Sequence, residues 1–98
     1  MATQGLTNLD KKLFKATEYL KSIGAKEIIL FGSLADGTFD SRSDIDLAVA
    51  GISPKAYFRA VVELPSLVNW KVDLIAIDHA RQDFAGYIRK YGKVIYAI

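Results

Sequence analysis

Two short segments decide how this chain is organised: Leu30-Phe31-Gly32-Ser33-Leu34-Ala35-Asp36-Gly37 and Ser43-Asp44-Ile45-Asp46-Leu47-Ala48-Val49. The residues 27–31 are apolar and rich in strand-forming types, which predicts a buried strand that ends at Gly32-Ser33. The residues 33–43 predict a short helical turn followed by a loop. The residues 44–50 then alternate strictly between two faces, as in a strand with carboxylates on one side and Ile, Leu and Val on the other.

Working outward, apolar spacing and helix-capping residues predict the elements on either side of these segments. Thr7 or Asn8 caps a first helix that ends at Gly24. Its apolar stripe recurs at helical spacing: Leu9, Leu13, Ala16, Leu20 and Ile23. Ser53-Pro54 begins a second helix, which Pro65 must end or kink.

The last third of the chain predicts a strand, a helix and a short terminal segment. The residues 72–77 form the third strand, with Asp73 on the opposite face from Val72 and Leu74. Asp78 caps a last helix that Gly92 closes, and residues 93–98 form a tail or a short edge strand. The order of elements predicts an α+β fold in one domain, residues 1–98, with helices packed on one face of a small sheet.

Composition limits the class of protein. The chain has 98 residues, of which 51% are hydrophobic and 24% charged, as in a small globular domain. No cysteine is present, which excludes disulfides, thiolate metal sites and cysteine nucleophiles. The net charge of +2 is too weak to favour nucleic acid as a direct ligand. No signal pattern occupies residues 1–12 and no apolar run approaches the ~20 residues of a membrane span, so we expect a cytoplasmic protein without membrane association.

Three aspartates form the candidate chemical centre. Asp44 and Asp46 share one face of their strand, roughly 6.6 Å apart along it. If the third strand is adjacent, Asp73 lies about 5 Å to the side. Carboxylates this close repel one another, and without cations at least one must bind a proton. Mg²⁺ resolves the repulsion because it prefers oxygen ligands and shares its shell with phosphates, and two ions about 3.5–4 Å apart stabilise both oxygens of a phosphoryl displacement.

The Gly32-Ser33 turn supplies the expected counterpart, a phosphate-binding element. Glycine lets the backbone approach a phosphate closely, and Ser33 opens a helical turn whose N–H groups and hydroxyl point toward the triphosphate. Taken alone, a D-x-D strand is also compatible with a solvent-facing sheet edge, and Gly-Ser is a common turn. The combination favours a site, because ten residues separate Ser33 from Asp44-Ile45-Asp46 and a third strand carries one more aspartate.

These segments resemble the minimal nucleotidyltransferase (MNT) group of the DNA polymerase beta superfamily, over essentially the whole chain. The resemblance implies a mixed sheet with helices on one face and transfer of a nucleoside monophosphate from an NTP, usually ATP, to an acceptor hydroxyl. By position, it implies that Gly32 and Ser33 hold the triphosphate and that Asp44 and Asp46 bind metal. It implies that Asp73 completes the metal site and helps to activate the nucleophile. Many MNT proteins are antitoxins that silence a helical HEPN ribonuclease toxin by adding AMP to a tyrosine.

One position departs from the family pattern. Family members commonly read Gly-Ser-x-Ala-Arg-Gly, and this chain has Asp36 in place of the arginine. A carboxylate there opposes the phosphates where a cation would favour them, and Arg42 or a partner's basic residue is the candidate substitute. The aromatic residues Phe39, Tyr57 and Trp70 are either core residues or platforms for an adenine ring.

Three functions remain open at this point. The first is a metal-dependent nucleotidyltransferase that acts as an MNT antitoxin, the second a binding module that neutralises its partner by occlusion, and the third the catalytic subunit of a two-chain transferase for a small molecule. The carboxylate face also carries apolar residues, namely Ala48, Ala50, Ile75 and Ile77. We therefore expect a second chain to cover that face, either another copy or a helical HEPN-type partner.

Overall fold

The computed structural model describes residues 7–98, so part of the expectation for residues 1–12 lies outside the described residues. The elements in chain order are α1 (Asn8–Ser22), β1 (Glu27–Phe31), α2 (Ser33–Asp36), β2 (Ile45–Ala50), α3 (Pro54–Val68), β3 (Val72–Ala76), the 3-10 turn η1 (Ile77–His79), α4 (Gln82–Tyr91) and β4 (Lys93–Ala97). The predicted α+β class is confirmed, and the last residues form a strand. Across residues 7–98 no helix combines the length and the apolar character needed to cross a membrane.

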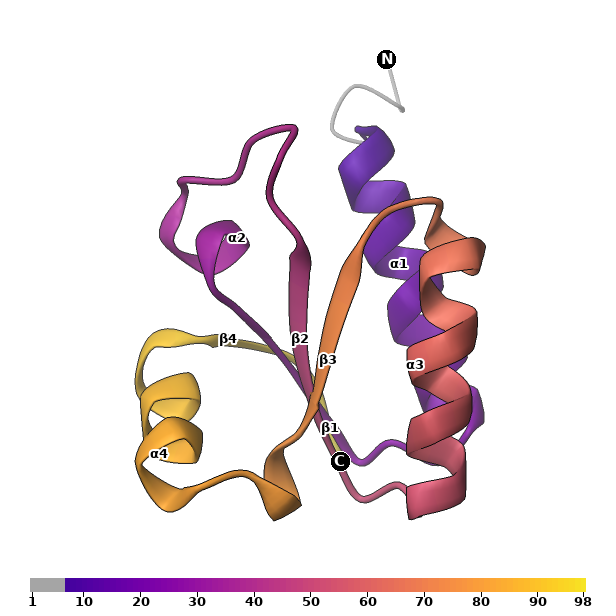
Figure 1. Ribbon diagram of the computed structural model, residues 1–98, viewed down its shortest axis with the longest axis vertical. Helices are drawn as coiled ribbons and strands as arrows, with labels where there is room; N and C mark the ends of the chain where they lie inside the picture. Colours follow the sequence, from indigo (N-terminus) through magenta and orange to yellow (C-terminus); the bar gives the residue numbers. More distant parts are fainter. Residues whose placement is uncertain (1–6) are drawn as a thin grey trace.

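The four strands form one mixed sheet in the order β3-β2-β1-β4. β1 pairs antiparallel with both β2 and β4, and β2 pairs parallel with β3. The parallel pair is possible because α3 carries the chain back from the end of β2 to the start of β3, as a parallel connection requires (Figure 1). β3 and β4 are therefore the two edges of the sheet.

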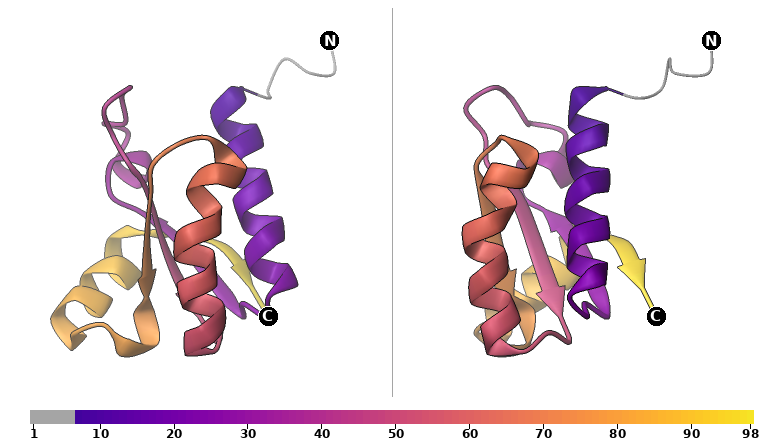
Figure 2. Two further views of the ribbon diagram at one scale, coloured as in Figure 1. Left: turned by 45° about the vertical axis from the view of Figure 1, so that its right-hand side comes forward. Right: turned by 90° about the vertical axis from the view of Figure 1, so that its right-hand side faces the viewer.

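The two 15-residue helices α1 and α3 lie side by side on one face of the sheet, as predicted (Figures 1 and 2). The prediction that all helices lie on this face is wrong for α4, which packs on the other face, and the single turn α2 lies on that side at the end of β1 (Figure 1). Ile88 of α4 is fully buried there and belongs to a second apolar cluster with Ile29, Phe31, Ala48 and Ile77. A helix is needed on this side because four of the five residues of β1 are buried, which leaves both faces of that strand apolar.

Two local predictions concern helix ends. Of the two effects predicted for Pro65, an end or a kink, the first is excluded, because α3 continues to Val68 with Leu64 and Val68 buried on either side of the proline. Asp78 does not cap the last helix. Its carboxylate accepts the backbone N–H of Gly51 at 3.0 Å, the residues around it form η1, and α4 begins four residues later at Gln82.

The expected apolar patch on the carboxylate face is largely covered by the chain itself. Ala48 and Ile77 are buried, whereas Ala50 and Ile75 are half-buried. The prediction that all four residues need a second chain is therefore wrong for two of them, because α4 and η1 pack over this end of the sheet.

Candidate active site

Gly32 lies directly after β1 and brings the turn against the carboxylate of Asp46. Its φ of 71° falls in the region that side chains disfavour. A Cβ at this position would collide with the Oδ2 of Asp46, so no other residue fits without displacing that carboxylate. Phe31 and Asp46 are register partners across β1 and β2, which places the turn and the carboxylate at the same level of the sheet. Gly32 is therefore required by both its backbone conformation and its neighbour.

Ser33 begins α2, a single helical turn. The hydrogen bonds of this turn start with the N–H groups of Ala35 and Asp36, which both donate to the carbonyl of Gly32 at 3.0 and 3.1 Å. The amides of Ser33 and Leu34 precede these bonds, so the turn itself does not use them. Together with the Ser33 hydroxyl they are the groups that a bound phosphate would engage.

Asp46 and Asp73 are direct register partners in the parallel pair of β2 and β3. Partners on adjacent strands place their side chains on the same face, about 5 Å apart. Asp44 lies one residue before β2 and is exposed, as is Asp73, whereas Asp46 is half-buried between its neighbours. The structure thus brings Gly32, Asp46 and Asp73 together in the arrangement that the sequence predicted.

The electrostatics of the site centre on Asp46. Burial first, and then the nearby charges of Asp73 and Asp44, together raise the pKa of this carboxyl to about 6. A carboxyl with this pKa is partly protonated near neutral pH in the free protein. Any cation bound beside it would favour the ionised form.

The donor set fits a magnesium ion that completes its shell with phosphate. Within residues 7–98, no three aspartate, glutamate or histidine side chains converge closely enough to hold a metal by themselves. Mg²⁺ seldom needs such a cage, because one or two carboxylates together with substrate phosphates and water satisfy it. Asp46 and Asp73, with Asp44 beside them, supply those oxygens next to the Gly32-Ser33 turn, and their mutual repulsion favours a bound cation.

Asp36, which replaces the family's arginine, is engaged within its own turn. Its Oδ1 accepts the N–H of Thr38 at 3.0 Å and the Thr38 hydroxyl at 2.6 Å. These hydrogen bonds hold the pKa of Asp36 below its usual value. An Asp followed two residues later by Thr is typical of such a turn. Asp36 is therefore a charged residue that closes α2.

Arg42 lies in the loop before β2, and its guanidinium is 3.4 Å from the carboxylate of Asp40. The Arg42 side chain is 89% exposed. Among the hydrogen bonds and ion pairs of residues 7–98, its contacts are with Asp40. Its role as the substitute cation for the triphosphate stays a prediction.

The three aromatic residues considered for base stacking pack against the core. Trp70 donates its indole N–H to the carbonyl of Ser43 at 2.8 Å and packs on Phe39, with ring centroids 5.9 Å apart. Tyr57 donates its hydroxyl to the carbonyl of Leu74 at 2.7 Å. All three are half-buried and pack against the cluster under α1 and α3.

A Gly-Ser turn beside paired strand carboxylates is the arrangement expected of a nucleotidyltransferase. The family description "Polymerase beta, Nucleotidyltransferase" matches residues 14–98, and the chain belongs to this family. It is therefore a nucleotidyltransferase enzyme of the minimal kind. No curated protein matches the sequence.

Several solved structures share this fold. A toxin–antitoxin structure with AMP-PNP is 27% identical with a TM-score of 0.77, covering 87% of this chain and 73% of that one. A mutant MntA–HpeT toxin–antitoxin is 26% identical with a TM-score of 0.74, covering 88% and 72%. A chain in the structure of the tri-AMPylated Shewanella oneidensis HEPN toxin in complex with MNT antitoxin is 22% identical with a TM-score of 0.63, covering 89% and 73%, and has the same fold.

Proposed function

We propose that this protein is a metal-dependent nucleotidyltransferase that transfers AMP from ATP to a hydroxyl of a helical HEPN-type toxin, with release of pyrophosphate, and thereby acts as its antitoxin. The observation that carries the proposal is the contact geometry at Gly32. The turn that would hold the triphosphate lies against Asp46, and Asp46 is the register partner of Asp73. Phosphate and carboxylates are thus expected at one point, where only a bridging cation makes them compatible.

Each residue has a distinct part in the proposed reaction. The amides of Ser33 and Leu34 bind phosphate oxygens, and Gly32 admits them close to the backbone. The metal ligands are the carboxylates of Asp44, Asp46 and Asp73, which would hold two Mg²⁺ ions. When bound, these ions would neutralise charge on the triphosphate and align it. Asp73, exposed on the edge strand β3, is the carboxylate that an acceptor can approach, and it accepts the acceptor hydroxyl's proton.

Two observations support ATP as the nucleotide and a HEPN-type toxin as the partner. The structure that shares 27% identity with this chain is a toxin–antitoxin with AMP-PNP, an ATP analogue. The Shewanella oneidensis relative in fold is an MNT antitoxin in complex with a HEPN toxin that carries three AMP groups. We extend both to this chain because Gly32, Asp46 and Asp73 occupy the positions that such a transfer requires.

Asp36 supports a second candidate, an antitoxin that acts by occlusion. Its charge at the end of α2 opposes phosphate, and no replacement cation contacts the turn among the described side chains. In that case the protein neutralises its partner by binding alone. A third possibility is transfer of the nucleotide to a small molecule, which differs from the first proposal only in the identity of the acceptor.

The decisive experiment is transfer from α-labelled ATP. The protein is co-expressed with the product of its neighbouring gene, or incubated with lysate of the source cell, in Mg²⁺ and then in chelator. We expect label on one protein band, lost in chelator and in Asp73→Asn. Labelling of a small molecule would favour the two-chain transferase. Neutralisation of the partner without label would favour occlusion.

A further inference from the structure

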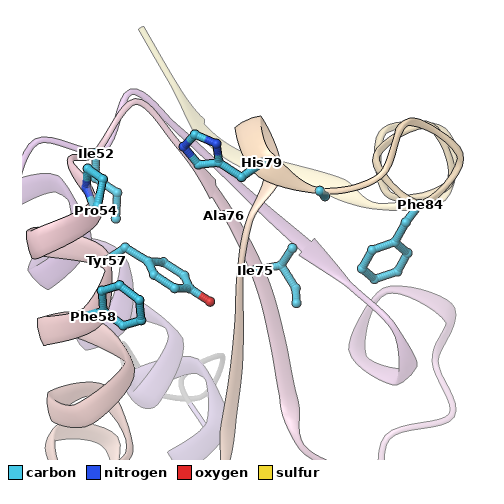
Figure 3. A pocket seen from close by; sticks show the side chains of 9 residues that line it. Ile52, Pro54, Tyr57, Phe58, Ile75, Ala76, His79 and Phe84 are labelled. Carbon is cyan, nitrogen blue, oxygen red and sulfur yellow. The ribbon is translucent and has the colours of Figure 1, made fainter.

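An apolar cavity of about 420 Å³ lies between the start of α3, the edge strand β3 and the segment leading into α4 (Figure 3). Its walls include Tyr57 and Phe58 from α3, Ile75 from β3 and Phe84 from α4, and His79 and Ala80 lie at the connection between them. None of its lining residues is Asp, Glu, Lys or Arg. The volume and the aromatic lining are those of a binding pocket rather than of a packing defect.

Contacts within the chain hold the walls in place. Tyr57 is fixed by its hydrogen bond to the Leu74 carbonyl, and its ring meets that of Phe58 edge-on at 5.6 Å. Phe84 is held by an edge-on ring contact with Phe31, with ring centroids 5.9 Å apart and planes at 85°. Phe58 nevertheless remains 67% exposed. The cavity is therefore preformed and presents aromatic surface to solvent.

The cavity borders the carboxylate site on two sides. Ile75 follows Asp73 by two residues on β3, so their side chains lie on the same face, roughly 6.6 Å apart along the strand. Phe84 packs on Phe31, the residue that precedes Gly32. A molecule that occupies the cavity is thus a neighbour of whatever reacts at Asp73.

We infer that this cavity is an acceptor subsite, which takes one aromatic or aliphatic side chain of the protein whose hydroxyl is modified. The inference rests on the proposed function and names how the acceptor is recognised. Because the lining carries no acidic or basic side chain, the cavity suits an uncharged group and not a phosphate. One turn of a helix advances about 5.4 Å, close to the spacing between Asp73 and Ile75. A helical acceptor therefore presents its hydroxyl to Asp73 and an apolar residue one turn away to the cavity.

The adenine ring of ATP is the competing occupant. A base is read through hydrogen bonds at its edge, and the cavity offers few of them. The Tyr57 hydroxyl already donates to Leu74, which leaves the His79 ring as the one other polar side chain of the lining. The charge and polarity of the lining thus favour an apolar protein side chain.

The test compares three variants: two that each remove an exposed phenylalanine, and one that fills the cavity. Phe58→Ala removes a cavity wall, whereas Phe14→Ala removes a phenylalanine of matched exposure, 65%, on α1. Ala80→Phe fills the cavity without altering Gly32, Asp46 or Asp73. Backbone NMR spectra are recorded for each protein with N-acetyl-phenylalaninamide at millimolar concentration, and separately with ATP and Mg²⁺. Thermal unfolding verifies that each variant folds.

We expect the amide probe to shift the resonances of Ile75, His79 and Phe84, and the shifts to be lost in Ala80→Phe and reduced in Phe58→Ala. Phe14→Ala should behave as the wild type. In transfer assays with the protein acceptor, Ala80→Phe and Phe58→Ala should raise KM about tenfold with kcat unchanged. The inference is overturned if the probe shifts no resonances in the wild type. It is also overturned if ATP shifts the cavity resonances and binds more weakly to Ala80→Phe than to the wild type. The probe experiment needs no nucleotide transfer, so its outcome is distinct from that of the proposed function.

Discussion

Asp46 on β2 and Asp73 on β3 are register partners across the parallel strand pair of the sheet. Parallel neighbours have their carboxylates on one face at one level, and the half-buried position of Asp46 adds desolvation to their repulsion. The pair is separated in the sequence by 26 residues, which include the whole of α3. The chemistry proposed for this enzyme depends on that pairing.

The raised pKa of Asp46 predicts that the free protein loses stability as pH rises. The folded-state pKa of about 6 lies above the usual value of 3.8, so the carboxyl binds its proton more tightly in the folded state. Its contribution to stability is complete below pH 3.8 and is lost as pH rises through 6. Asp46→Asn should remove this dependence and raise the free energy of unfolding at pH 7.5 by about 1 kcal/mol, after discounting for solvent screening.

Urea unfolding of the wild type and Asp46→Asn in chelator, at pH 4 and pH 7.5, measures this difference. Glu18→Gln in α1, which breaks one exposed ion pair with Lys21, is the control for loss of one surface charge. Equal pH dependence in the wild type and Asp46→Asn would show that Asp46 titrates normally.

Magnesium should be required for ATP binding. Without a cation, the triphosphate meets the carboxylates of Asp46 and Asp73 at the same point, and the repulsion opposes binding. Calorimetry should show heat of binding for ATP with Mg²⁺ and at least ~10-fold weaker affinity in chelator. Asp73→Asn should abolish turnover and retain more of the nucleotide binding than Asp46→Asn. Equal ATP affinity with and without Mg²⁺ would contradict the bridging role of the metal.

Gly32→Ala should damage the site more than Gly37→Ala, although both glycines have positive φ. The Gly37 φ is 85° and a Cβ there meets nothing within 4 Å, so Gly37→Ala bears only the backbone strain, about 1 kcal/mol. A Cβ at Gly32 also collides with the Asp46 carboxylate. We expect Gly32→Ala to lose ATP binding and a further ~1–2 kcal/mol of stability by thermal unfolding. Matching losses in the two variants would show that the contact with Asp46 is not needed.

Asp36→Arg tests whether the end of α2 faces the phosphates. Arginine restores the family's cation, so the affinity for ATP with Mg²⁺ should rise about three- to tenfold by calorimetry. Asp36→Asn is the matched control, because an asparagine oxygen can still accept the two Thr38 hydrogen bonds while the charge is lost. An affinity unchanged in Asp36→Arg would place this side chain away from the triphosphate.

Local periodicity and turn chemistry were sufficient for the elements that hold the first half of the site. The strict alternation around Asp44 and Asp46 predicts their common face, since the side-chain period of a strand is a local property. The two residues Gly32-Ser33 were likewise sufficient to predict the turn after β1. Helix ends were harder, because a proline or an aspartate has several local uses. Packing of Leu64 and Val68 carries α3 past Pro65, and Gly51 takes the carboxylate of Asp78.

The sequence by itself therefore determined the identity of the chemical groups and the face of the strand on which Asp46 lies. Only the tertiary structure decided that Asp73 is the register partner of Asp46, that Gly32 contacts the same carboxylate, and that α4 covers the opposite face of the sheet from α1 and α3. The physical reason is range. Strand alternation depends on neighbouring residues, whereas strand order, register and burial depend on which distant segments exclude water from one another.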